Sequence, residues 1–419
     1  MSKLTALLIV AGLFASASAS GQPSRDWPRF HGPSHDNKST ETGLLKKWPA
    51  AGPKLLWTAT GIGTGYSSVS VADGTIYTAG TVGKITYVFA FDLDGKLKWK
   101  TPNGGAWTAS RRQRYASSYA GSRSTPTCDA GRVYHLGELG RLAAFDAKTG
   151  REIWSLDLFK TFDATTPKYG LAESVLIDGD RLICSPGGTK GYMVCLEKAT
   201  GKLIWAAAGV PGKMGYCSAR IVEIAGRRQI LSFSSQAVFG LDAATGKLLW
   251  HVDHQNQRGN NVADPIPHDG CVLASSGYGK GSILIRLKPA DGGAVQAETV
   301  WASKLLDNHH GGVVLVGSHV YGSGHRARGW FCLDFATGKQ AWNTPGKGSL
   351  TYADGMLYCL DERGTMSLVE ATPDAHRLVS SFPVPKGGRG LHWAHPVVCN
   401  ARLYVRHADK LFAYDVGAE

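Results

Sequence analysis

The chain has 419 residues, of which 43% are hydrophobic and 19% are charged, and this balance excludes an intrinsically disordered protein. Glycine is in excess at 53 residues, yet no Gly-x-y period is present, so collagen is excluded. The net charge of +13 comes from scattered Lys and Arg, which indicates a solvated basic surface or one that attracts anionic partners. Excess glycine with 12 tryptophans indicates many short strands and tight turns.

The first twenty residues have the layout of a secretory signal peptide. Lys3 precedes an apolar run over residues 4–14, and alternating Ala and Ser over residues 15–20 offer a cleavage site. The apolar run is too short to span a bilayer, and no later stretch approaches membrane length. We therefore expect a signal peptide at residues 1–19 and an exported protein, periplasmic or extracellular, without a transmembrane segment. Export also argues against a nucleic-acid partner.

One sequence motif recurs along the rest of the chain: an apolar strand, Asp, two residues, Thr-Gly-Lys, two further residues and Trp. Clear copies end at Trp154, Trp205, Trp250 and Trp342, and a shorter copy ends at Trp99. Successive tryptophans of the repeat are 41–55 residues apart, which is the period of a β-propeller blade. Asp and Thr-Gly make a tight turn, because Gly adopts positive φ at little cost, and Trp opens the next strand.

A second family of turns marks the first hairpin of each blade. Its eight members are Asp73-Gly74, Ala130-Gly131, Asp178-Gly179, Ala225-Gly226, Asp269-Gly270, Val316-Gly317, Asp354-Gly355 and Asn400-Ala401. Each lies between runs of β-forming residues, which is typical of a short hairpin turn. Eight hairpins predict an all-β, eight-bladed propeller of four-stranded antiparallel blades.

The two ends of the repeat region predict how the ring closes. Residues 53–57 form a lone outer strand, whereas the last unit, residues 397–415, has three strands and lacks an outer one. Pairing the two would complete one blade from both ends of the chain and remove exposed strand edges. We therefore expect one monomeric propeller over residues 53–416, an N-terminal extension packed on it over residues 20–52, and a tail at residues 417–419.

Eight cysteines are scattered singly through apolar, strand-like segments, and none forms a Cys-x-x-Cys pair. This spacing favours buried thiols over a zinc site. One or two disulfides between neighbouring strands remain an open alternative at this point.

The Asp-x-x-Thr-Gly-Lys-x-x-Trp repeat resembles that of the pyrroloquinoline quinone (PQQ) propellers, which include quinoprotein alcohol dehydrogenases and the outer-membrane assembly factor BamB. The resemblance covers nearly the whole mature chain, and eight blades is the family count. Residues 26–33, 43–49 and 308–312 resemble segments of a secreted group of PQQ-like proteins that is common in planctomycete-type bacteria. The repeat is specific for the fold and not for the chemistry, because one fold supports many functions.

Loop lengths indicate which end of the propeller carries a site. Both turn families are tight and share one end, whereas long connections such as residues 101–122 and 251–263 crowd the other end. Ligands usually bind at loops held by a rigid scaffold. The residues that enter the innermost strands should ring the channel there, and the candidates are Tyr66, Arg123, Glu173, Tyr216, Asn261, Asp264, His309, His310, Lys347, Trp393 and His395.

These channel residues have two interpretations. Arg123 and Lys347 could hold a carboxylate or phosphate, and Glu173 and Asp264 could hold a hard cation. Alternatively, the polar groups plug the axis by pairing with one another and with water.

The His309-His310 pair raises the question of a metal. Neighbouring residues of a strand point to opposite faces, so we expect at most one of the two imidazoles to reach the channel. His395 and Glu173 would have to complete such a site. We assign no metal from the sequence and keep Glu173 as a calcium candidate.

The resemblance to the PQQ dehydrogenases implies a test of the cofactor. Their quinone and Ca²⁺ are held by a Glu, an Asn and a catalytic Asp, with a disulfide of two adjacent Cys against the ring. Glu173 lies in a similar segment here, and Arg123 is placed like their quinone-binding Arg. The loop that carries their Asn and Asp corresponds to residues 275–281, which contain neither, and no two Cys are adjacent. These losses remove the electrostatic basis of the reaction.

We therefore expect an exported binding or scaffold propeller that uses its long-loop face and polar channel. Its partner would be a protein of the cell envelope or an anionic or glycan ligand, and no cofactor or catalytic residue is assigned. Trp107 and Tyr115 could stack on a sugar or quinone ring, or pin their loop to the propeller. The alternative is a PQQ- and calcium-dependent alcohol or sugar oxidoreductase with a rearranged site.

Overall fold

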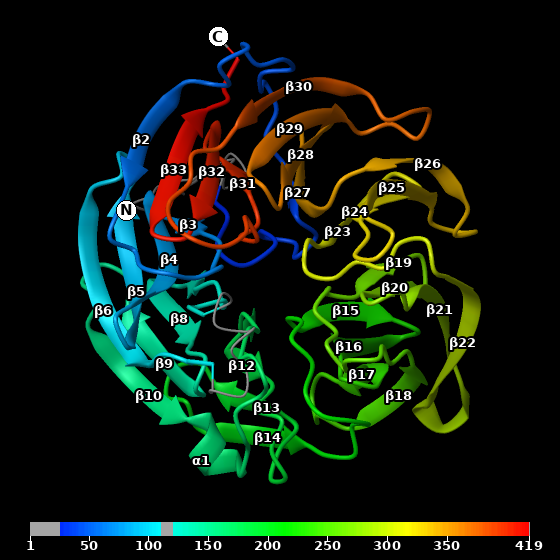
Figure 1. Ribbon diagram of the computed structural model, residues 1–419. Coiled ribbons are helices and arrows are strands. Elements are labelled where there is room, and N and C mark those ends of the chain that lie inside the picture. Colours follow the sequence, from blue (N-terminus) through cyan, green and yellow to red (C-terminus); the bar gives the residue numbers. More distant parts are fainter. Residues whose placement is uncertain (1–25, 110–119, 419) are drawn as a thin grey trace, which may run out of the picture.

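A computed structural model of the protein describes residues 26–109 and 120–418. These residues form eight antiparallel sheets of four strands around a central axis (Figure 1). One sheet carries an additional parallel strand, β1 (Lys38–Ser39), and the described helices are the short α1 (Leu158–Phe162) and a 3-10 turn at Asp291–Gly293. The prediction of an eight-bladed all-β propeller is confirmed.

Each of the first seven blades is one consecutive meander that runs from the channel outward. Blade 1 contains β3 (Ser70–Ala72), β4 (Thr75–Val82), β5 (Ile85–Asp92) and β6 (Leu97–Gly105), and blade 2 contains β7 (Thr127–Asp129), β8 (Arg132–Leu136), β9 (Arg141–Asp146) and β10 (Glu152–Asp157). Blade 3 contains β11 (Leu176–Asp178), β12 (Arg181–Cys184), β13 (Met193–Glu197) and β14 (Leu203–Ala207), and blade 4 contains β15 (Arg220–Ile224), β16 (Arg227–Phe233), β17 (Ala237–Asp242) and β18 (Leu248–Asp253). Blade 5 contains β19 (Ile266–His268), β20 (Cys271–Ser276), β21 (Gly281–Pro289) and β22 (Val295–Ser303), blade 6 contains β23 (Val313–Val316), β24 (His319–Ser323), β25 (Gly329–Asp334) and β26 (Gln340–Pro345), and blade 7 contains β27 (Gly348–Ala353), β28 (Met356–Asp361), β29 (Thr365–Glu370) and β30 (Leu378–Pro383).

Blade 8 is completed by both ends of the chain. Strands β31 (Val397–Cys399), β32 (Arg402–His407) and β33 (Lys410–Asp415) are joined on the outside by β2 (Leu55–Ala59), which pairs antiparallel with β33 (Figure 1). The predicted closure is therefore confirmed, and it leaves no gap in the ring.

The Thr-Gly-Lys turns do more than reverse the chain. At the second turn, Thr149 donates hydrogen bonds from N and Oγ1 to Asp146 Oδ1 at 2.8 and 2.6 Å. The indole of Trp99 in the preceding blade packs on Gly150, where an added Cβ would lie 2.5 Å from the ring, and Trp99 Nε1 donates to Ala147 O at 3.0 Å. The repeat thus joins neighbouring blades, which explains why Gly and Trp recur together.

A buried guanidinium lies at the seam where blade 8 meets blade 1. Arg406 of β32 is 2% exposed and donates to Ser67 O and Gly63 O at 3.2 Å, and also to Ala79 O. Burial lowers the pKa of Arg406 to about 9, so the group stays charged at neutral pH. It therefore links main-chain carbonyls across the closure.

The N-terminal extension crosses the tight-turn end of the inner strands. Its contacts with successive blades are the Trp27–Val71 bridge, the Cys128 N to Pro28 O bond at 2.7 Å, the Arg220 Nη2 to Ser34 O bond at 3.4 Å and the pairing of β1 with β27. The signal peptide predicted at residues 1–19 lies outside the described residues. Within the described ranges, no helix has the length and apolar character needed to cross a membrane.

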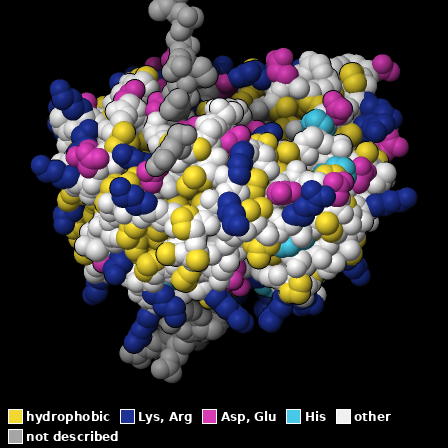
Figure 2. All heavy atoms as spheres, turned by 90° about the horizontal axis from the view of Figure 1, so that it is seen from above, with side chains coloured by type: hydrophobic (Ala, Val, Ile, Leu, Met, Phe, Trp, Pro, Cys, Tyr) yellow, Lys and Arg dark blue, Asp and Glu magenta, His cyan; other side chains and the backbone are white. Residues whose placement is uncertain are grey.

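All eight cysteines are buried and none forms a disulfide, so the thiols act as small apolar side chains. The basic residues are scattered as well. On the face that Figure 2 shows, Lys and Arg side chains are spread out and interspersed with Asp and Glu.

Candidate functional site

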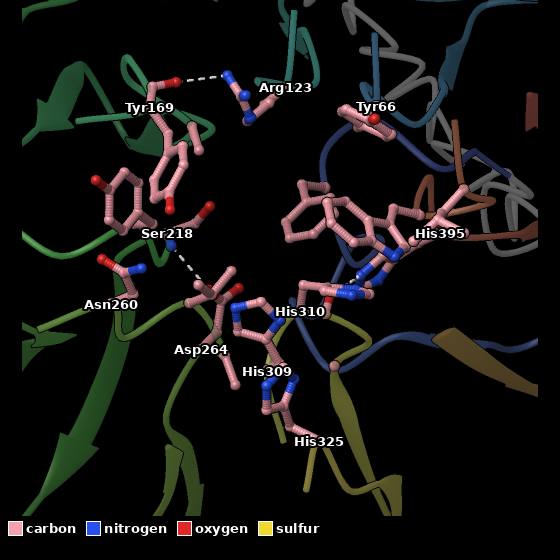
Figure 3. Close-up of a pocket in the computed structure, with 18 of the residues that line it drawn as sticks. Tyr66, Arg123, Tyr169, Ser218, Asn260, Asp264, His309, His310, His325 and His395 are labelled. Carbon is pink, nitrogen blue, oxygen red and sulfur yellow. Dashed lines mark hydrogen bonds between the residues drawn. The ribbon is translucent and has the colours of Figure 1, made fainter. Parts of the chain in front are cut away.

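A cavity of about 670 Å³ occupies the long-loop end of the channel (Figure 3). This volume is in the range of small-molecule sites. Nine of the eleven channel candidates line it, namely Tyr66, Arg123, Tyr216, Asp264, His309, His310, Lys347, Trp393 and His395. Each lies just before an innermost strand, so the chain order of the repeat brings these residues together. Their role in binding stays a prediction.

The other two candidates, Glu173 and Asn261, are fully buried and do not line the cavity. Glu173 accepts hydrogen bonds from Ser185 N at 2.8 Å and Ser185 Oγ at 3.3 Å, and burial raises its pKa to about 8. Asn261 donates to Ser234 O at 2.7 Å and accepts from Ser276 Oγ at 2.6 Å. Both side chains therefore support loops behind the cavity wall.

The floor of the cavity comes from the N-terminal extension. His31 Nδ1 lies 3.1 Å from Asp264 Oδ2, and His31 Nε2 lies 3.0 Å from His395 Nδ1. His395 Nε2 donates to His310 O at 2.7 Å, and burial lowers the pKa of His395 to about 3, so His395 is neutral and accepts at Nδ1. His31 Nε2 therefore donates to His395, and His31 Nδ1 faces the Asp264 carboxylate. Phe30 stacks on His31 with ring centroids 3.8 Å apart.

Arg123 lies on one side of the cavity (Figure 3). Its Nη1 donates to Tyr169 O at 2.6 Å, and its guanidinium lies 5.3 Å from the ring centroid of Trp107. Trp107 is 5% exposed and is not part of the lining, so it holds Arg123 in place from behind. Tyr115, the other aromatic candidate of this insertion, lies outside the described residues.

Glu362 organises the other side of the cavity and was missed by the sequence analysis. Its Oε1 accepts from Trp393 Nε1 at 2.7 Å, Lys347 Nζ at 2.8 Å and His310 Nε2 at 3.1 Å. Burial alone would raise the pKa of Glu362, but the hydrogen bonds from His310 and Lys347 outweigh burial and lower the pKa to about 2. The carboxylate is thus ionised and fully engaged at one oxygen.

We name the group of Tyr278, His309, His310 and His325 the histidine corner. The ring centroid of His309 lies 4.5 Å from that of His325, 5.0 Å from that of His310 and 4.9 Å from that of Tyr278. Burial lowers the pKa of all three imidazoles, in the case of His325 to about 4, so they are neutral at pH 7. Their Nδ1 atoms are buried and make no hydrogen bond to any described residue.

The expectation that at most one of His309 and His310 reaches the channel is wrong. Both line the cavity, because they lie in irregular chain before β23 and not in a strand with alternating faces. Tyr278, His325 and Glu362 were missed because they lie in the loops between the second and third strands of blades 5, 6 and 7. Those loops open on the same end as the long connections.

The residues of the cavity do not fit calcium-bound PQQ. Glu173 and Asn261 lie outside the lining, and Asp264 is occupied by Ser218 N at 2.7 Å and by His31. Across residues 26–109 and 120–418, no three His, Cys, Asp or Glu side chains lie close enough together to hold a metal ion. A hard cation needs several oxygen ligands, which the cavity does not offer.

The fold and the cavity place the protein in a class: it is a repeat propeller with a cavity of small-molecule size at one end of its channel. A family model described as the outer membrane protein assembly factor BamB matches residues 86–344 and 280–378. The chain therefore belongs to this family of PQQ-like repeat propellers.

Two curated relatives are quinohemoprotein alcohol dehydrogenases of Pseudomonas putida. ADH-IIG is 33% identical over 156 residues, and ADH IIB is 31% identical over 152 residues. These segments cover 34% and 33% of this chain and 19% of each relative, so the match spans about a fifth of the relatives' length.

Two solved structures share the fold. BamB from Moraxella catarrhalis has a TM-score of 0.58 and 16% identity, and the match covers 88% of this chain and 99% of that one. Quinohemoprotein alcohol dehydrogenase from Comamonas testosteroni has a TM-score of 0.64 and 14% identity, with 94% and 81% covered. At these identities the likeness concerns the fold alone, because one fold supports several functions.

Proposed function

We propose that the protein is an exported propeller that binds a small acidic saccharide in the cavity at the long-loop end of its channel. The observation that carries the proposal is the lining of that cavity. It combines aromatic rings with cationic groups, and both of its carboxylates are already ion-paired within the protein.

Charge favours an anionic ligand. The charged groups of the lining, apart from His31, are the cations Arg123, Lys168, Arg258 and Lys347 and the carboxylates Asp264 and Glu362. Asp264 pairs with His31 and Glu362 pairs with Lys347, so the acidic groups are compensated before any ligand arrives. The lining therefore holds four cations and two carboxylates, and this excess of positive charge attracts carboxylates and phosphates.

The aromatic side chains favour a ring-shaped ligand. Tyr66 lies against Trp393 with ring centroids 5.3 Å apart, and Tyr169 lies 6.1 Å from Tyr216. All four rings line the cavity and are partly exposed. Such surfaces stack on sugars or planar rings.

The quinone dehydrogenase alternative draws on the relatives' names and on the position of Arg123. It lacks support from the cavity, because both carboxylates of the lining are bonded to protein donors and no group of metal ligands is found among the described residues. A protein partner of the cell envelope is a second candidate, favoured by the family description as an outer membrane assembly factor. Such a partner would be captured by cross-linking on the long-loop face.

Titration calorimetry tests the proposal directly. Protein without residues 1–19 is titrated with galacturonic acid, glucose, glucose 6-phosphate, and PQQ with and without Ca²⁺. We expect the acidic sugars to bind, with weaker binding at high salt, and glucose to bind poorly. Comparison of the carboxylated and phosphorylated sugars identifies the acidic group.

Arginine variants locate the binding site. Arg123→Gln should weaken binding of the acidic sugar by about tenfold, because it removes a charge-assisted hydrogen bond. Arg151→Gln, on the exposed tight-turn end, is the matched control and should bind as the parent does. Binding of PQQ that requires Ca²⁺, or acidic-sugar binding that is equal in both variants, would overturn the proposal.

A further inference from the structure

We propose that the histidine corner is a second acidic subsite, which receives another carboxylate of the same saccharide and takes up a proton when that carboxylate binds. The inference rests on the proposed function and sharpens it. The ligand then carries at least two acidic groups, one at Arg123 and one at the histidine corner, as in a dimer of uronic acids.

The placement of the two subsites supports this ligand. Figure 3 shows Arg123 and the pair His309 and His325 on opposite sides of the cavity, with Ser218 and Asp264 between them. A volume of about 670 Å³ is large enough for a disaccharide. Phe30 and His31 line the cavity, and His31 contacts both Asp264 and His395, so a ligand in the cavity would lie above this contact and between the two sides.

Within the histidine corner, His309 and His325 have unused hydrogen-bonding capacity, whereas His310 is bonded to Glu362. His309 and His325 line the cavity, and neither ring makes a side-chain hydrogen bond within the described residues. Their Nδ1 atoms are buried, and the Nε2 atoms are the ring nitrogens left to meet a ligand. Because nothing fixes the tautomer, each imidazole can present an N–H at Nε2. A carboxylate accepts hydrogen bonds and is matched by two such donors.

The charged neighbours of the histidine corner favour imidazoles that are neutral in the free protein and take up a proton when an anion binds. Lys347 faces the histidine corner as a cation, whereas Glu362 and Asp307 face it as carboxylates that are bonded to protein donors. Burial keeps the imidazoles neutral when no anion is present. Tyr278 and Trp393 pack against them without adding charge.

A bound carboxylate reverses this balance. An opposite charge within about 4–6 Å raises the pKa of a histidine by roughly 1–3 units. The pKa of His325, about 4 in the free protein, would then move toward neutrality. Affinity rises as the pH falls through the raised pKa of the complex, and it levels off below the pKa of the free protein.

The test uses digalacturonic acid and galacturonic acid as probes. Calorimetric titrations at about pH 5.5 and pH 7.5 keep the ligand carboxylates ionised. We expect the dimer to bind about tenfold more tightly at the lower pH. Repeating each titration in two buffers of different ionisation enthalpy should show net proton uptake for the dimer and none for the monomer.

Histidine variants assign the proton. His309→Gln and His325→Gln should each reduce the pH dependence of dimer binding, whereas His251→Gln, on an exposed face of β18, should retain it. Dimer binding without proton uptake in the parent protein overturns the inference, even if the variants fail to fold, and it leaves the proposed function standing. Failure of both probes to bind at either pH contradicts the proposed function itself.

Discussion

The two ends of the propeller are built on opposite principles. At the tight-turn end most blades repeat the same turn chemistry, and an Asp, a Thr-Gly and the preceding Trp satisfy one another. At the long-loop end no single motif recurs from blade to blade, and three buried nitrogens of the histidine corner have no partner among the described residues. Repetition therefore marks the positions that specify the ring, and departure from repetition marks the positions available for binding.

The seam between blades 8 and 1 offers the largest expected effect. Arg406→Met should lower the free energy of unfolding by about 4 kcal/mol, because it leaves buried carbonyl groups without their donor. Chemical denaturation measures the loss. An unchanged unfolding midpoint would show that the ring closes through strand pairing alone.

The repeated glycine provides a second test within one blade. Gly246 and Gly226 have φ of 73° and 69°, but an added Cβ would lie 2.4 Å from Trp205 only at Gly246. We expect Gly246→Ala to cost about 3 kcal/mol, since strain and overpacking add. At Gly226, where no atom lies within 4 Å, Ala should cost about 1 kcal/mol. Equal costs in thermal unfolding would remove the role assigned to the Trp–Gly contact.

Glu362 predicts a smaller effect that depends on pH. The folded protein depresses the pKa of this carboxyl from its usual 4.5 to about 2, so its stabilising contribution is present above pH 4.5. That contribution falls as the pH drops toward 2, and it amounts to about 2 kcal/mol. Glu362→Gln should therefore flatten the decline in unfolding free energy over this interval. A decline as steep as that of the parent would assign the dependence to other carboxyl groups.

The sequence predicted the tight-turn end well because its chemistry is local. Asp, Thr, Gly and Trp at fixed spacing determine turn, strand and period without knowledge of distant contacts. The nine cavity residues were also predictable, since each precedes an innermost strand and the ring places those positions at one end. This success concerns their placement, and their ligand stays a proposal.

The rest of the site depends on contacts that the repeat does not encode. Phe30 and His31 reach the channel because the extension crosses the inner strands, a path that no turn motif specifies. Glu362 follows a second strand, so the entries to the innermost strands do not predict it. Glu173 and Asn261 were misplaced, since irregular entry loops do not fix which way a side chain points.

The central claim is that the long-loop end binds an acidic saccharide between Arg123 and the histidine corner. A crystal structure of the protein with digalacturonic acid tests it most directly. We predict one carboxylate within hydrogen-bonding distance of Arg123 and the other at the Nε2 atoms of His309 and His325. Saccharide bound elsewhere on the propeller, with the cavity lining free of it, would contradict the account.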